Sequence, residues 1–184
     1  FEYILRQNGI DPSEVKIDQS IDFGSTAAAF SGGQADYTIE FEPSATALET
    51  ENADYVVASL GVDSGYVPYT AYSAKTSYLN ANPNIIQKFT NALQKGMDFV
   101  QSHTPEEIAK VIAPQFKETD LATITTIVSR YYKQDTWKSD LIFKEESFNL
   151  LQNILESSGE LKERVPYEEL VTTTFAEKAA KSSR

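Results

Sequence analysis

Two short loops each place an aromatic side chain beside polar groups at the start of a predicted helix. Each loop follows a predicted strand, and the residues concerned are Phe23, Gly24 and Ser25 in the first loop and Phe41, Glu42 and Ser44 in the second. A phenyl ring can stack on a flat ligand, and a helix start offers free N–H groups. The glycine allows close backbone approach, while hydroxyls and a carboxylate supply hydrogen bonds. These residues therefore indicate non-covalent binding of a small molecule.

Glu42 is the strongest single candidate, because a carboxylate at a helix start gains from the helix dipole and can bind a cationic or amide group. Capping is the competing role for Glu42 and for Ser25, and core packing is the competing role for the two phenylalanines. Tyr69 and Thr70 are added as binding candidates. A phenol can pack on one side and hydrogen-bond a ligand on the other.

Covalent and metal chemistry find little support in the composition. The chain contains no cysteine, which excludes disulfides, thiolate metal ligands and a cysteine nucleophile. Its one histidine, His103, lies in a polar link between two predicted helices, where we expect an exposed ring without a partner. Neither a metal nor a cofactor is therefore expected.

Acidic residues dominate the N-terminal third of the chain. The net charge is −11, and residues 1–65 hold two basic side chains against twelve acidic ones. Without a basic stripe to neutralise phosphates, nucleic acid is not an expected partner. The acidic segment is either a solvated face that aids solubility or part of a site for a neutral or cationic solute.

Helical and extended signals alternate along the first 75 residues. Predicted strands cover 15–18, 37–41 and 55–59, separated by short helices that end near Asn8-Gly9 and Gly32-Gly33 or begin at Pro43. This order favours a parallel sheet with crossover helices. From Pro83 onward, apolar residues recur every three to four positions, which predicts a series of helices. The first runs from Pro83 to about Ser102, and the second starts after the Thr104 capping box. Three more are predicted over residues 121–131, 148–155 and about 167–180.

In the order and spacing of several short motifs, the chain resembles the family of binding proteins for nitrate, sulfonate, taurine and thiamine-pyrimidine precursors. The resemblance extends over nearly the whole chain, and its strength lies in the spacing of the set. The motifs are Ala29-Phe30-x-x-Gly33-x-x-Asp36-Tyr37, Phe41-Glu42-Pro43, Pro68-Tyr69-Thr70-Ala71-Tyr72, Asn82-Pro83-Asn84-Ile85-Ile86-Gln87-Lys88-Phe89 and the tail from Phe148 to Gly159-Glu160-Leu161, Pro166-Tyr167 and Phe175-Ala176-Glu177.

The resemblance implies an α/β fold of the type II periplasmic-binding-protein class, with two lobes and incomplete at the N-terminus. Residues 1–64 would form the second-lobe α/β portion with its parallel sheet. Residues 65–74 would form the interlobe crossing, hinge and return strand, consistent with Gly65 and Pro68. Residues 75–184 would form the mainly helical C-terminal portion of the first lobe.

The function implied is the extracytoplasmic solute-binding component of an ABC importer, in the periplasm or lipid-anchored on a bacterial surface. It would capture a pyrimidine-like solute, or a sulfonate, taurine or nitrate, and deliver it to the permease subunits without catalysis. Two alternatives share the fold, namely a thiamine-pyrimidine synthase-like enzyme and the effector-sensing domain of a transcription regulator. We also expect this chain to self-associate or to retain the missing N-terminal part.

Overall fold

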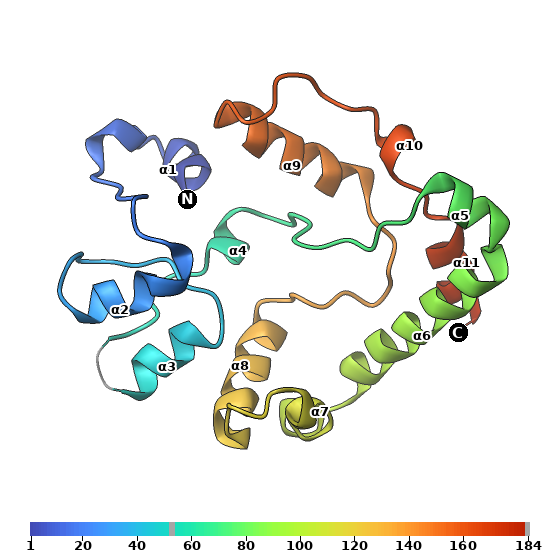
Figure 1. Ribbon diagram of the computed structural model, residues 1–184, viewed down its shortest axis with the longest axis horizontal. Helices are drawn as coiled ribbons and strands as arrows, with labels where there is room; N and C mark the ends of the chain where they lie inside the picture. Colours follow the sequence, from blue (N-terminus) through green and yellow to red (C-terminus); the bar gives the residue numbers. More distant parts are fainter. Residues whose placement is uncertain (52–53, 183–184) are drawn as a thin grey trace.

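The computed structural model describes residues 1–51 and 54–182, and Figure 1 shows the helices spread along one long axis. Within these residues the structure contains helices and no strand. None of the helices described is long and apolar enough to cross a membrane. The elements are α1 (Glu2–Gln7), η1 (Pro12–Glu14), η2 (Phe23–Ser25), α2 (Thr26–Ser31), α3 (Ser44–Thr50), α4 (Leu60–Asp63), α5 (Thr76–Ala81), α6 (Pro83–Ser102), α7 (Pro105–Ile112), η3 (Ala113–Gln115), α8 (Leu121–Lys133), α9 (Glu145–Ser157), α10 (Tyr167–Leu170) and α11 (Thr174–Ser182).

Local capping signals placed most helix boundaries correctly. Helix α6 starts at Pro83, and α7 starts with the predicted capping box, in which the side chain of Thr104 and that of Glu107 each accept a backbone N–H. The glycines after α1, α2 and α9 have left-handed φ values near 75°, as a helix stop requires. The predicted last helix is divided into α10 and α11, and the sequence patterns did not indicate α4 or α5.

The segments predicted as strands do not pair into a sheet in the described part of the chain. Segments 15–18, 37–41, 55–59 and 69–74 are neither helical nor paired in a ladder in the described part of the chain. Their residues favour extended backbone, but a strand is stabilised only when a neighbour accepts its hydrogen bonds and covers its side chains. The α/β class is therefore not observed here, and the parallel sheet expected within residues 1–64 is absent from residues 1–51 and 54–64.

The densest core lies between α7 and α8. Ile108, Ala109, Ile124 and Val128 are buried against one another, and Trp137 packs on the cluster. This packing follows from the apolar stripe on each amphipathic helix, because the two stripes shield each other from water. Helix α8 is thus fixed on one face by α7, and its other face remains available for contacts with residues 1–66.

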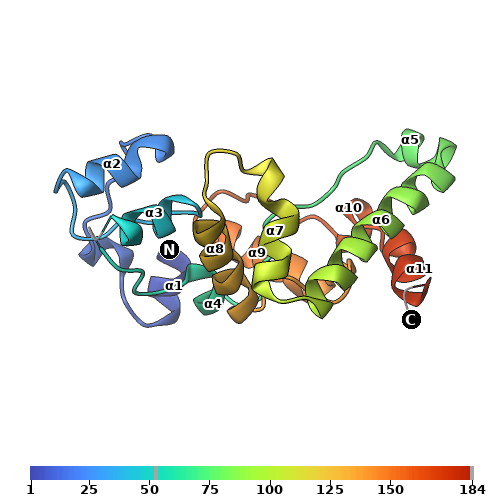
Figure 2. The ribbon, with the colours of Figure 1, turned by 90° about the horizontal axis from the view of Figure 1, so that it is seen from below.

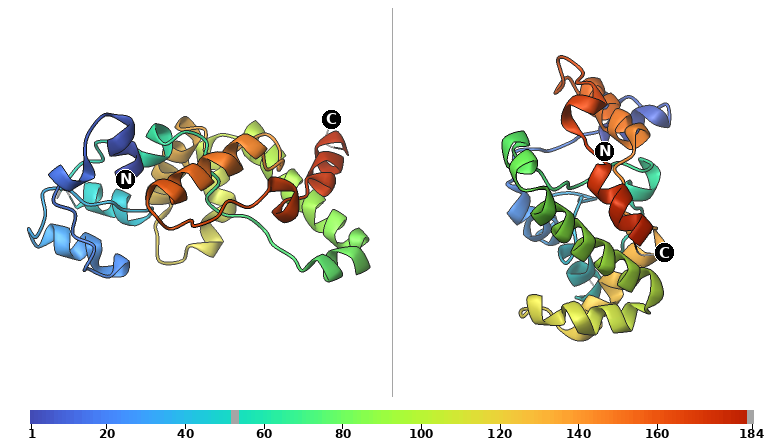
Figure 3. Two further views of the ribbon diagram at one scale, coloured as in Figure 1. Left: turned by 90° about the horizontal axis from the view of Figure 1, so that it is seen from above. Right: turned by 90° about the vertical axis from the view of Figure 1, so that its right-hand side faces the viewer.

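A second contact joins α6 to α11, which lie side by side at one end of the molecule in Figures 2 and 3. The side-chain amide of Gln87 donates to the carbonyl oxygen of Phe175 at 3.0 Å. Further along α6, the buried amide of Gln94 donates to the carbonyl oxygen of Ser139, in the segment between α8 and α9, at 2.8 Å. Helices α1, α2 and α3 lie toward the opposite end, so the two chain ends are far apart along the long axis. Residues 65–74 run between these two ends.

The molecule is open. Its accessible surface is 13161 Å², whereas a compact protein of this mass would expose roughly 8,900 Å². Many large apolar side chains are consequently exposed, among them Tyr37, Tyr55, Tyr69 and Tyr72 on the segments predicted as strands. These segments have the composition of buried structure but lack a cover within the described residues.

Candidate functional site

Three of the residues predicted to bind a ligand form one aromatic cluster. The ring of Phe41 lies 5.1 Å from that of Phe23 and 5.4 Å from that of Tyr69, measured between centroids. The three rings come from three separate segments, and the exposed fractions of the whole residues are 51% for Phe23, 50% for Phe41 and 79% for Tyr69. We call these three residues the ring cluster. The rings pack on one another at interplanar angles of 60° and 57°, and their outer exposed faces can receive a flat ligand.

The Phe23 loop is shaped by Asp22, which the sequence patterns did not single out. The carboxylate of Asp22 accepts the backbone N–H of Gly24 at 3.1 Å and closes the η2 turn. A Cβ atom at Gly24 would lie 3.2 Å from that carboxylate, which explains the glycine. Ser25 occupies the N-cap position of α2, but its side chain makes no cap hydrogen bond, and its exposed hydroxyl remains a candidate ligand contact.

Glu42 is committed to protein partners. One carboxylate oxygen accepts the backbone N–H of Thr46 at 3.0 Å, which caps the first turn of α3, and the other forms an ion pair with Arg130. Only 6% of the Glu42 side chain is exposed. The capping role expected as an alternative is therefore present, and direct ligand binding by Glu42 stays a prediction.

Arg130 bridges two carboxylates. Its guanidinium forms ion pairs with Glu42 and Glu49, and it also donates to the hydroxyl of Thr46 at 3.0 Å. The pKa of Glu49 is lowered, first by the backbone N–H of Val56 at 3.0 Å and then by Arg130. A planar fork with several donors suits this bridging better than a lysine ammonium would.

The neighbouring Tyr131 packs its ring against Trp137 at 5.9 Å between centroids. Burial raises the pKa of its phenol, and the negative charge of Glu42 and the phenol of Tyr69 raise it further. Sequence interpretation missed both Arg130 and Tyr131. Arg130 looked like an ordinary basic residue in the last turn of a helix, and its acidic partners are more than 80 positions away, so no local pattern could reveal the pairing.

The remaining candidates, Ser44 and Thr70, are not aromatic and take no part in the ring contacts. Ser44 is the half-buried first residue of α3, and Thr70 lies on the exposed segment after Tyr69. His103 is not the unpartnered ring that we expected. It stacks on Phe99 at 3.7 Å between ring centroids, and its Nδ1 lies 2.8 Å from the Phe99 carbonyl oxygen. No metal-binding group of His, Cys, Asp or Glu occurs among the described residues.

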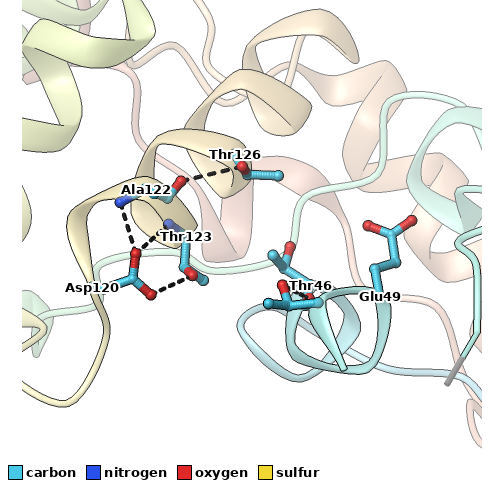
Figure 4. A pocket seen from close by; sticks show the side chains of 7 residues that line it. Thr46, Glu49, Asp120, Ala122, Thr123 and Thr126 are labelled. Carbon is cyan, nitrogen blue, oxygen red and sulfur yellow. Dashed lines mark hydrogen bonds between the residues drawn. The ribbon is translucent and has the colours of Figure 1, made fainter. Parts of the chain in front are cut away.

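A shallow pocket of about 320 Å³ lies between α3 and the start of α8 and is separate from the ring cluster (Figure 4). Its polar groups are largely engaged, because Asp120 accepts the backbone N–H groups of Ala122 and Thr123 as a helix cap. Aromatic side chains are missing from its lining, which consists of Thr46, Glu49, Thr50, Asp120, Ala122, Thr123 and Thr126. The ring cluster is therefore the better candidate site.

Comparison with known proteins adds an independent observation. A family model described as "NMT1/THI5 like" matches residues 1–108, more than half of the chain. A protein of Bacillus subtilis (strain 168) named "Putative binding protein YtlA" is 40% identical over 178 residues, which cover 96% of this chain and 53% of that protein. The chain thus spans about half the length of this curated relative. No solved structure gives a significant match.

Proposed function

This chain belongs to the NMT1/THI5-like family of solute-binding proteins, and from that premise we propose that it captures a small, flat organic solute at the ring cluster. The proposal rests on the observation that Phe23, Phe41 and Tyr69 converge from three segments while each of these residues stays half or more exposed. Core aromatics would be covered, and scattered surface aromatics would not converge.

The charges beside the ring cluster favour an uncharged aromatic solute. Glu42 is paired with Arg130 and has little exposed surface, so it offers no free charge to a ligand. A sulfonate or nitrate would need cationic or amide donors, whereas a pyrimidine-like ring needs mainly stacking area and a few hydrogen bonds. The hydroxyls of Ser25 and Thr70 could supply such bonds.

In the complete protein, the proposed role is the solute-binding component of an ABC importer outside the cytoplasm. The supporting facts are the family membership and the printed name of the relative, which describes binding. Delivery of the solute to membrane permease subunits, without chemical change, completes the proposal. A solute held between two parts of the protein would favour the closed arrangement in proportion to its additional contacts there.

Calorimetric titration of the full-length protein tests the proposal. An aminopyrimidine, taurine and nitrate are titrated separately against the parent protein and the Phe41→Ala variant. We expect the aminopyrimidine to bind and Phe41→Ala to weaken it about 10-fold or more, because one stacking face is removed. Phe116→Ala is the matched control, since that ring is also half exposed but lies outside the ring cluster. Equal affinity in parent and Phe41→Ala would exclude this site.

A further inference from the structure

Arg130 is connected to the ring cluster through a short covalent and ionic path. Its guanidinium is paired with Glu42, and Glu42 is the residue directly after Phe41. The other oxygen of the same carboxylate accepts the N–H of Thr46. Glu42 is thereby held between α8 and the first turn of α3, and the backbone that carries Phe41 is held with it.

The position of Arg130 is itself well fixed. It lies on α8, which is anchored by its buried residues Ile124 and Val128 against α7. A second ion pair, to Glu49 on α3, keeps the guanidinium in one orientation. A charged group fixed by one acidic partner on α3 and another just before α3 can transmit the position of α8 to that helix and to Phe41, the residue before Glu42.

We infer that Arg130 is a positioning residue for the candidate solute site, acting through Glu42 to hold the Phe41 ring against Tyr69. Only the description of the ring cluster as a solute site rests on the proposed function. The two rings touch without any solute, so the positioning role can be tested by itself.

The test compares Arg130→Met with the parent full-length protein by NMR, in the absence of solute, using labelled phenylalanine and tyrosine. The measured signal is the nuclear Overhauser cross-peak between the Phe41 and Tyr69 rings. We expect this cross-peak to vanish or to weaken several-fold in Arg130→Met. Arg164→Met is the control, because Arg164 pairs with Glu156 away from the ring cluster, and it should leave the cross-peak unchanged. A merely stabilising Arg130 would lower the melting temperature and leave the cross-peak intact, and that result would overturn the inference.

Two further variants separate the path through Glu42 from a general effect. Glu49→Gln removes the second ion pair of Arg130 but keeps Glu42, so the cross-peak should persist. In a Glu42→Gln background, adding Arg130→Met should change the cross-peak little, because the path is already broken. Should Arg130→Met fail to fold, Arg130→Gln decides the question. A neutral glutamine cannot form the ion pair with Glu42, so a cross-peak of parental strength would overturn the inference.

Solute titration then provides a separate readout. If the Phe41 and Tyr69 rings separate in Arg130→Met and the parent protein binds none of the three test solutes, the positioning role stands and the proposed function fails. If the parent binds the aminopyrimidine, Arg130→Met should weaken that binding about as much as Phe41→Ala does. Suppose instead that the two rings separate in Arg130→Met and the solute still binds with parental affinity. Contact between the Phe41 and Tyr69 rings would then not be needed for solute binding.

Discussion

The phenol of Tyr66 donates a 2.9 Å hydrogen bond to the carboxylate of Asp135, across 69 positions of sequence. Lys138 pairs with the same carboxylate and places its ammonium 3.7 Å from the centre of the Tyr66 ring. Ser59 donates to Gln134 at 2.8 Å nearby. Within residues 1–51 and 54–182, the side-chain hydrogen bonds that join residues 1–66 to the C-terminal helices all involve residues 130, 134 and 135. The last turn of α8 and the residues after it are therefore the polar contact between these two parts.

Loosening this contact should expose the predicted crossing to solvent exchange. Asp135 has a left-handed φ of 55°, which asparagine tolerates, so Asp135→Asn removes the charge without straining the backbone. We expect amide hydrogen exchange over residues 61–67, which lead into the crossing and include its first residues, to speed up several-fold. Stability should change by no more than about 1 kcal/mol because the carboxylate is exposed. Tyr78→Phe, at an exposed tyrosine of α5, is the control. Unaltered exchange in Asp135→Asn would mean that the negative charge of Asp135 does not hold the crossing.

Pro68 restricts the backbone of the same crossing, since its ring fixes φ. Pro68→Gly in the full-length protein should alter opening and closing more than stability, because an exchange at a hinge changes the freedom of the linker and few packed contacts. Small-angle scattering measures the outcome as the compaction that a bound solute induces. The crossing would have to lie elsewhere if parent and variant compacted equally.

Glu49 should contribute stability that disappears in acid. Its pKa in the folded protein is lowered from 4.5 by the Val56 N–H and by Arg130. Its contribution is thus complete above the unfolded value of 4.5 and is lost as the pH falls through the lower folded-state value. We expect Glu49→Gln to cost about 1 kcal/mol at pH 7, because the pair is partly exposed, and progressively less at pH 4 and pH 3. Urea unfolding measures the difference, and Glu51→Gln is the control. A pH-independent gap between parent and Glu49→Gln would contradict this assignment.

The exposed apolar surface should drive association of this chain when it is isolated. Ile85 and Phe89 on α6 are about half exposed, and the total surface far exceeds that of a compact protein. Burying such surface yields about 25 cal/mol per Å², so a dimer, a larger oligomer or a complex with an added N-terminal part is expected. Sedimentation at micromolar concentration decides the matter. A compact monomer of 20.5 kDa would show that the exposed rings find cover within the chain.

Helix boundaries could be read from the sequence because caps and amphipathic stripes are local. The capping box at Thr104, the start at Pro83 and the glycine stops depend on side chains and φ preferences within a few positions. Strands could not be read in the same way. The β-forming segments around Tyr37 and Tyr55 have the right composition, but strand pairing requires a second segment to supply hydrogen bonds. Composition by itself does not specify that partner.

The binding candidates show the same division between local and long-range causes. The residue types at the ring cluster, aromatic rings beside a turn and a helix start, could be predicted from the sequence because the residues of a loop are consecutive. That Phe23, Phe41 and Tyr69 meet, and that Glu42 pairs with Arg130, became evident only from the folded chain. The two charges are 88 positions apart, and their pairing depends on how α8 packs. Helix α8 is positioned by burial of its apolar residues on α7, and the residues around Glu42 contain no signal of that packing.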